Sequence, residues 1–255
     1  NMKKYQVGIV GYGDFTKVML KWLEPYADIV VSSRSHTEGD AGFGAQFAPL
    51  DEVLASPIIV PSIPSQFFEQ FCNTNKRLIN PEALVIDVCS VKVKPLAVLE
   101  KCLPQTCSII GTHPLFGPAS IKKNGGLAGL RCVVSDVRSN KGQCDELITF
   151  LKQTLGLTVL ERTPEQHDKE MAYVQGLSHY IARTMDIMDI PKSELSTMAY
   201  DDLYDMKMVQ AKDTWDLFES IMHDNPFALE VNQQFKHAQT MLDADISAER
   251  GSLTE

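Results

Sequence analysis

The sequence predicts an α/β protein in which a mostly parallel sheet, with helices on both faces, precedes a smaller all-helical domain. Through residues 5–160, short apolar runs of strand length alternate with helical patterns. From Thr163 onward, helical patterns follow one another with no strand signal between them. A glycine turn separates the first apolar run from the first helical pattern. We therefore expect two domains, 1–162 and 163–255.

The glycine turn predicts a Rossmann-like dinucleotide-binding domain. A strand is expected at residues 5–10 and helical spacing runs from 18 to 23, with Gly11-Tyr12-Gly13-Asp14-Phe15-Thr16 between them. Gly11 permits the tight turn, and Gly13 lets backbone N–H groups approach a pyrophosphate at the helix N-terminus. Thr16 stands where the usual fingerprint has a third glycine. We expect the cofactor to bind at Gly11, Gly13, Asp14, Phe15 and Thr16.

The second strand, expected at residues 28–31, leads into Ser33, Arg34 and Ser35. An NAD site usually places a carboxylate here, on the ribose 2′-hydroxyl, whereas hydroxyls and a guanidinium suit a 2′-phosphate. These three residues therefore favour NADP, with NAD as the alternative. Ser62 follows the strand expected at 57–60 and is expected to line the nicotinamide pocket.

The remaining pattern completes both domains. Further strands are expected at 84–88, 108–111, 130–135 and 157–160, with helices at 50–55, 66–71, 96–101 and 145–155. The second domain begins with Thr163 as a helix cap and Pro164 at the first helical position, and its helices continue to 185 and then span 198–208, 214–222 and 227–243. A small helical domain of this kind commonly buries its apolar faces against a second copy, so we expect a homodimer.

Composition excludes several classes of function. The net charge of -9 and pI of about 5.2 argue against a nucleic-acid partner. No apolar run has the length of a membrane span, and no signal-peptide pattern occurs, so a cytoplasmic protein without a membrane partner is expected. The six cysteines include no Cys-x-x-Cys pair, which predicts no structural metal.

Two polar clusters mark the expected reaction site. Ser90 follows the apolar run at 84–88, and His113 follows the run at 107–111. Ligands collect beyond the carboxyl ends of parallel strands, so both side chains are expected on neighbouring loops that face one crevice. A histidine has the pKa that a proton-removing base requires. The alternative is a histidine that caps a strand end.

A third cluster lies on the first helix of the second domain. Gln175, His179 and Arg183 are spaced at i, i+4 and i+8, so they share one face of the helix. A polar face within an apolar stretch should look into a cleft or meet a partner. The alternative is a solvated helix edge.

These motifs together resemble the prephenate/arogenate dehydrogenases of tyrosine biosynthesis. The resemblance rests on the glycine turn, residues 87–92, Gly111-Thr112-His113-Pro114-Leu115-Phe116-Gly117-Pro118, His167-Asp168 and Gln175-Gly176-Leu177-Ser178-His179-Tyr180. The chain looks most like the plant-type, NADP-dependent arogenate dehydrogenases at Ser33-Arg34-Ser35 and Asp224-Asn225-Pro226. It is expected to be a stand-alone catalytic core of this family.

The resemblance implies a role for each candidate residue. His113 would be the general base, and Ser90 would bond the substrate hydroxyl or orient His113. Lys92 would lie within reach of the cofactor or a substrate carboxylate. His179, with Gln175 and Arg183, would bind the carboxylates of the substrate from the helical domain, so that the active site would lie between the two domains.

Two choices remain open at this point. The substrate is either the keto acid prephenate or the amino acid arogenate, whose ammonium group would suit an acidic side chain such as Asp202, Asp205 or Asp213. Two alternatives to this family are also open: another NAD(P)-dependent dehydrogenase of small hydroxy acids, and a non-catalytic NADP(H) sensor. A sensor has no need for His113 and Ser90 to converge.

Overall fold

The computed structural model describes residues 4–140 and 142–252, and it divides the chain into two compact units, Asn1–His167 and Asp168–Glu255. The boundary expected from the sequence, between 162 and 163, falls slightly earlier than this division. Both positions lie near helix α7 (Pro164–Met171), which crosses from the first unit into the second.

The first unit is built on one nine-stranded sheet, which contains the seven strands expected from the sequence and two more, β3 and β4. The strand order is β3-β4-β2-β1-β5-β6-β7-β8-β9. Neighbouring strands run parallel except in the β3–β4 and β7–β8 pairs, so the mostly parallel Rossmann-like fold is confirmed. The strands are β1 (Tyr5–Val10), β2 (Ala27–Ser32), β3 (Gly39–Gly42), β4 (Ala45–Phe47), β5 (Ile58–Pro61), β6 (Leu84–Asp87), β7 (Ser108–Pro114), β8 (Arg131–Arg138) and β9 (Thr158–Glu161).

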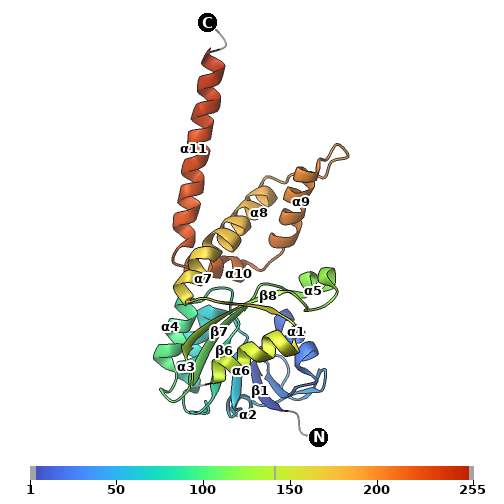
Figure 1. The fold of residues 1–255 in the computed structure, drawn as a ribbon, viewed down its shortest axis with the longest axis vertical. Helices are drawn as coiled ribbons and strands as arrows, with labels where there is room; N and C mark the ends of the chain where they lie inside the picture. Colours follow the sequence, from blue (N-terminus) through green and yellow to red (C-terminus); the bar gives the residue numbers. More distant parts are fainter. Residues whose placement is uncertain (1–3, 141, 253–255) are drawn as a thin grey trace. The chain divides into compact units, whose positions relative to one another are not determined.

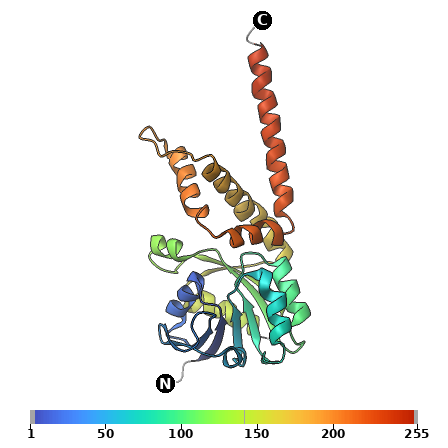
Figure 2. The same ribbon diagram turned by 180° about the vertical axis from the view of Figure 1, so that it is seen from behind.

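Helices cover both faces of this sheet. They are α1 (Asp14–Leu23), α2 (Leu50–Leu54), α3 (Phe68–Asn75), α4 (Val93–Cys102), α5 (Pro118–Asn124) and α6 (Gln143–Thr149), with a 3-10 turn at Ser65–Phe67 and a π-helical turn at Phe150–Thr154. Figures 1 and 2 show α6 and the α3–α4 pair on opposite sides of the sheet. Alternate strand residues serve the two sides: Ile59 and Val85 pack with α2, α3 and α4, whereas Val60 packs with α1.

Three short elements escape the sequence pattern. Strands β3 and β4 form a hairpin in which Gly39, Gly42 and Gly44 take positive φ angles. Glycines of this kind carry no apolar alternation, so the strand signal is lost. Helix α5 begins at Pro118 and ends at Gly125, whose φ of 76° closes its C-terminus. Its seven residues are too few to show a clear helical period.

The second unit consists of helices, as predicted. They are α8 (Ser178–Ile187), α9 (Met198–Gln210), α10 (Trp215–Glu219) and α11 (Ala228–Ser252), with π-helical turns at Ala172–Leu177 and Ser220–Asp224. The buried Asn225 joins two of its segments. Its Nδ2 donates to the carbonyl oxygen of Asp168 at 2.8 Å, and its Oδ1 accepts from the backbone N–H of Phe227 at 2.9 Å. The Asp224-Asn225-Pro226 motif thus has a structural role at the start of α11.

The helical unit also exposes much apolar surface. Of the seventeen large hydrophobic side chains that are exposed among the described residues, fourteen lie after residue 168. They include Ile187, Leu195 and Met198, each more than 80% exposed, and Met241 and Leu242 on the outer half of α11. Monomeric proteins rarely leave so much apolar area in contact with water.

Two further properties concern the described residues only. None of their helices combines the length with the apolar character that a bilayer crossing needs. They contain no group of three or more His, Cys, Asp or Glu placed to hold a metal ion, and all six cysteines are free thiols.

Candidate active site

Position 11 in the glycine turn admits no side chain. Gly11 has a φ of 105°, and a Cβ there would lie 2.3 Å from the carbonyl oxygen of Ser62. Backbone hydrogen bonds hold this arrangement, because the N–H of Gly11 donates to Ser32 and the N–H of Ser62 donates to Val10, both at 2.8 Å. Ser62 therefore lies directly against the turn.

Thr16 takes the place of the third glycine for a visible reason. The side chain is fully buried, and its Oγ1 lies 3.0 Å from both the carbonyl oxygen of Gly11 and the Oγ of Ser62. It thereby joins the first turn of α1 to the ends of β1 and β5. A third glycine would leave this link unmade.

The N-terminus of α1 suits a phosphate group. Gly13 precedes the helix with no side-chain cap, and a Cβ there would meet no atom within 4 Å. The first N–H groups of a helix, here those of Asp14 and Phe15, have no acceptor within the helix and point outward. The Asp14 carboxylate is exposed and lies 3.7 Å from the Nζ of Lys17. Open space beside glycine backbone and available N–H groups fit the pyrophosphate of a dinucleotide.

Polar groups gather in the turn after β2. The Oγ of Ser33 lies 3.1 Å from the Oγ of Ser35, and Arg34 is exposed. Sequence reasoning missed the next residue, His36. Its Nδ1 lies 2.9 Å from the Oγ of Ser35, and its ring stacks on Phe47 with centroids 4.9 Å apart. The sequence does contain a signal for His36, because a histidine directly after three phosphate-binding candidates adds a further polar group to the same turn.

His113 and Ser90 lie near the carboxyl ends of the neighbouring strands β7 and β6. The register of the parallel pair β6–β7 places Asp87 opposite Gly111. Ser90 lies three residues beyond the first of these positions, and His113 lies two residues beyond the second. One detail of the prediction was wrong, because His113 belongs to β7 itself and not to a loop after it. The antiparallel partner β8 extends the strand by pairing Val133 with His113.

The imidazole of His113 is buried and bonded to a second histidine. Its Nδ1 lies 2.8 Å from the Nε2 of His167, and both side chains are at least 95% buried. Burial lowers the pKa of His113 well below its ordinary value, and the neighbouring His167 and Lys92 lower the pKa further. His113 is therefore a neutral imidazole at physiological pH. His113 is therefore not simply a histidine that caps a strand end, because its ring is paired with that of His167.

His167 was not among the site residues expected from the sequence. It entered only as part of the His167-Asp168 motif, and a single histidine within a helix carries no pattern that names its partner. In the hydrogen bond between the two rings one nitrogen donates and the other accepts, so the tautomer of each ring depends on that of the other. His167 is thus a positioning residue for His113.

Lys92 has a buried partner within the same unit. Its ammonium group forms an ion pair with the carboxylate of Asp87, and both side chains are fully buried. The charge of Lys92 still reaches His113, whose pKa it lowers. The expectation that Lys92 binds cofactor or substrate stays a prediction.

In the helical unit, His179 and Arg183 form a partly buried cluster with Asp213, and Gln175 precedes His179 by four residues. The Nη2 of Arg183 donates to the carbonyl oxygen of Asp213 at 2.5 Å, and the Nε2 of His179 lies 3.7 Å from the Oδ2 of Asp213. The side chain of His179 is only 6% exposed, so a solvated helix edge does not describe it. Four buried polar atoms of this cluster have no hydrogen-bond partner among the described residues: Gln175 Oε1, His179 Nδ1, Arg183 Nε and Gln210 Oε1.

His179 and Asp213 are close enough for an ion pair, but the charge on His179 argues against one. Burial, and secondarily the Arg183 guanidinium, lowers the pKa of His179 to about 4. Burial also raises the pKa of Asp213, against the opposing effect of Arg183. At neutral pH His179 is therefore a neutral imidazole and carries no charge toward Asp213. Arg183 therefore supplies the positive charge of this cluster.

A glycine turn at a helix N-terminus, on the edge of a mostly parallel sheet, defines the class of dinucleotide-binding α/β proteins. Within this class the model of one family, described as the nucleotide-binding domain of prephenate dehydrogenase, matches residues 28–155. The chain belongs to the prephenate dehydrogenase family.

Curated relatives and solved structures are consistent with this family. The chain is 27% identical to arogenate dehydrogenase 2 and 26% identical to arogenate dehydrogenase 1 of Arabidopsis thaliana, both named as chloroplastic, over 88% and 91% of its length. It spans 65% and 38% of these two relatives. A structure of A. aeolicus prephenate dehydrogenase with hydroxyphenyl propionate and NAD+ aligns over 98% of this chain and 92% of its own, at 19% identity and a TM-score of 0.73. A structure of Synechocystis arogenate dehydrogenase aligns over 96% of this chain and 93% of its own, at 19% identity and a TM-score of 0.72.

The state of His179 can be measured directly. We expect its ring protons to titrate in NMR with a pKa of about 4, and Arg183→Leu to raise this pKa because a positive neighbour is removed. Since the folded pKa lies below the ordinary value of 6.5, the unfolded state binds the extra proton first. His179 therefore costs stability as the pH falls from about 6.5 to about 4, by up to ~1.4 kcal/mol per pH unit. A His179 signal that titrates near 6.5 would contradict its buried, neutral state.

Proposed function

We propose that this protein oxidises and decarboxylates arogenate or prephenate, with hydride transfer to NADP, and so makes tyrosine or 4-hydroxyphenylpyruvate. The observation that carries the proposal is the buried, neutral His113, held by His167 at the sheet edge where Ser90 also lies. Family membership supports the reaction class. The names of the two plant relatives support the substrate class.

His113 is the base of the proposed reaction. For Nε2 to accept the proton of the substrate hydroxyl, Nδ1 must keep its own proton and donate it to the Nε2 of His167. Ser90 bonds the same hydroxyl and orients it toward His113. When the proton leaves, the ring carbon releases its hydride, and the ring carboxylate departs as CO2. The product ring is aromatic, which supplies the driving force without a separate acid for decarboxylation.

The cofactor of the proposal is NADP. The glycine turn and the N-terminus of α1 hold the pyrophosphate, while Ser33, Arg34 and Ser35 hold the 2′-phosphate, with His36 beside them. A carboxylate on the ribose, which NAD sites favour, does not occur in this turn. When bound, NADP supplies the nicotinamide carbon that accepts the hydride.

The helical unit binds the substrate carboxylates in this proposal. Arg183 provides charge, and His179 and Gln175 provide hydrogen bonds. Buried polar atoms without partners are costly, and an incoming carboxylate would satisfy the donors among them. Asp213 favours arogenate over prephenate, because its carboxylate suits an ammonium group and repels a purely anionic substrate. Asp202 and Asp205 are exposed on α9 and are assigned no role.

We also propose that the protein forms a homodimer through its helical unit. The exposed apolar side chains of residues 173–246 support this, since a second copy would remove them from water. The outer half of α11, which is exposed from residue 236 to 248, offers a long surface for such a partner.

Reduced-nicotinamide absorbance tests the proposal, with NADP or NAD and either arogenate or prephenate. We expect turnover with NADP, and a loss of kcat of about 100-fold or more in His113→Asn, because the proton acceptor is removed. His237→Asn changes an exposed histidine and should leave kcat unchanged. Because the pKa of His113 is lowered, the rate should not fall as the pH drops from about 8 to 6.5. A protein that binds NADP but turns over neither substrate would contradict the proposal and favour the sensor.

Cofactor choice is tested at position 34. Arg34→Asp replaces a phosphate-binding cation with a carboxylate that bonds a ribose hydroxyl, so the ratio of kcat/KM for NADP to that for NAD should fall by at least about 100-fold. Arg77→Asp, a charge reversal at another exposed arginine, is the matched control. An unchanged ratio in Arg34→Asp would remove Arg34 from the cofactor site.

Substrate choice is tested at position 213. Asp213→Asn removes the charge that meets the ammonium group, so kcat/KM for arogenate should fall by about 10-fold or more relative to that for prephenate. Asp205→Asn on α9 is the control, because this exposed carboxylate lies outside the cluster. Equal effects of Asp213→Asn on both substrates would show that another group reads the side chain.

A further inference from the structure

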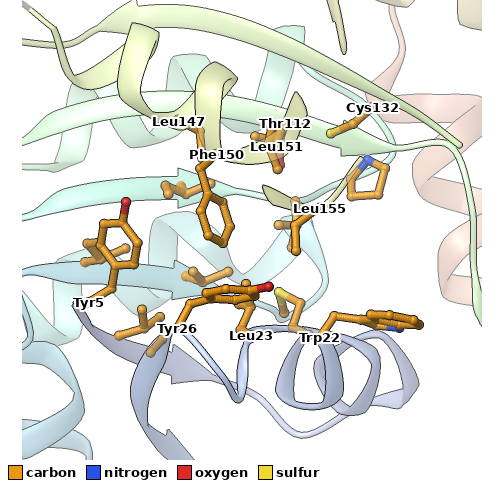
Figure 3. Close-up of a pocket in the computed structure, with 18 of the residues that line it drawn as sticks. Tyr5, Trp22, Leu23, Tyr26, Thr112, Cys132, Leu147, Phe150, Leu151 and Leu155 are labelled. Carbon is orange, nitrogen blue, oxygen red and sulfur yellow. The ribbon is translucent and has the colours of Figure 1, made fainter. Parts of the chain in front are cut away.

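An apolar cavity of about 430 Å³ lies within the first unit, between the sheet and two helices. Its floor is formed by strands β1, β5, β6 and β7, and its walls are α1 on one side and α6 with the following π-helical turn on the other. Figure 3 shows Leu147, Phe150 and Leu151 directed from α6 and this turn toward Leu23 of α1 and the nearby Tyr26. Cavities of this size are typical of small-molecule sites.

The cavity is distinct from the proposed reaction site. Side chains alternate along a strand, and Thr112 and Pro114 of β7 line the cavity. His113 lies between them and so projects from the opposite face of the sheet, where Gly111 approaches Leu96 and Lys92. A molecule in the cavity would touch the strand that carries His113 without touching His113 itself.

The lining selects against charged ligands. It includes six aromatic rings, those of Tyr5, Phe15, Trp22, Tyr26, Phe116 and Phe150. The two ionisable carboxyls in the lining are Glu82 and Glu146, and no Lys, Arg or His lines the cavity among the described residues. A dinucleotide or a carboxylate substrate carries negative charge that these side chains cannot neutralise.

One end of the cavity has a polar, solvent-exposed rim. Phe150 packs edge-on against Tyr5 and Tyr26, with ring centroids 5.6 Å and 5.5 Å apart. The hydroxyl of Tyr5 donates to Glu146 at 3.1 Å, and the Nζ of Lys4 lies 2.9 Å from the same carboxylate oxygen. Glu146 is thus already paired at this rim, so it does not attract a cation into the cavity. A water molecule would also be poorly held in the cavity, because a stable buried water needs two to four polar partners.

We propose that this cavity is a binding site for an uncharged, mainly apolar molecule that contains a ring. Aromatic side chains offer stacking and edge contacts to such a ring, and the aliphatic strand residues fill the space around it. Phe15 lies in the first turn of α1, beside the glycine turn, while Thr112 donates a hydrogen bond to the carbonyl oxygen of Asp87 at 2.8 Å. An occupant would therefore pack against both the helix that receives the pyrophosphate and the strand that carries His113. This link to catalysis rests on the proposed function, but the binding itself does not.

The test is direct binding of the neutral probe N-phenyl-1-naphthylamine to the full chain. In a Trp215→Phe background, Trp22 is the only tryptophan left, and it lines the cavity. We expect saturable quenching of its emission, with a dissociation constant of about 1–100 µM for a ligand of this size. The anionic analogue 8-anilinonaphthalene-1-sulfonate should bind at least 10-fold more weakly. Saturating NADP should not displace the probe.

Two variants fill the cavity from opposite walls. Val18→Phe on α1 and Leu151→Phe on the π-helical turn should each weaken binding of the neutral probe at least 10-fold, while thermal unfolding shows that the chain stays folded. Val209→Phe, an exposed change in the helical unit, should leave binding unchanged. The proposal is overturned if the neutral probe does not saturate, if both filled variants bind it as the parent does, or if the sulfonate binds equally well. Because the assay contains no substrate, failure of the proposed dehydrogenase activity would leave its outcome unaffected.

Discussion

The buried ion pair between Asp87 and Lys92 is the interaction on which the reaction edge of the sheet depends. Asp87 uses three acceptors: its Oδ2 pairs with Lys92, its Oδ1 accepts from the backbone N–H of Cys89 at 2.9 Å, and its carbonyl oxygen accepts from Thr112. Cys89 leads directly to Ser90, and Thr112 directly precedes His113. One carboxylate residue therefore holds both segments that carry the site. Replacing Lys92 would leave the buried Asp87 carboxylate without its opposite charge, and breaking a buried ion pair in this way typically costs about 3–5 kcal/mol.

The same pair shapes the acidity of His113. The ammonium group of Lys92 adds to burial and to His167 in disfavouring a second positive charge on the ring. A base of lowered pKa is always available, but it holds a proton weakly. In the proposed reaction His113 is therefore neutral, and able to accept a proton, throughout the physiological pH range.

The sequence predicted those parts of the structure that depend on local pattern. Strand β1 was predicted at its observed bounds, and the glycine turn between this strand and α1 was predicted at its observed place, because strand, turn and helix each carry their own signal. Thr16 looked like a defect in the fingerprint, whereas its link to Ser62 depends on two segments far apart in the chain. For the same reason the sequence could not pair His113 with His167, nor place His113 inside β7, because both depend on tertiary neighbours. The β3–β4 hairpin was missed because glycines do not show alternation.

The candidate groups are divided between the two units in a way that has an evolutionary consequence. The His113–His167 pair and the Asp87–Lys92 ion pair are both encoded within residues 87–167, whereas the cluster around Arg183 is encoded after residue 168. Under the proposed function, the two properties could change separately in evolution: substitutions in the helices would act on substrate choice, and substitutions in residues 87–167 would act on proton transfer.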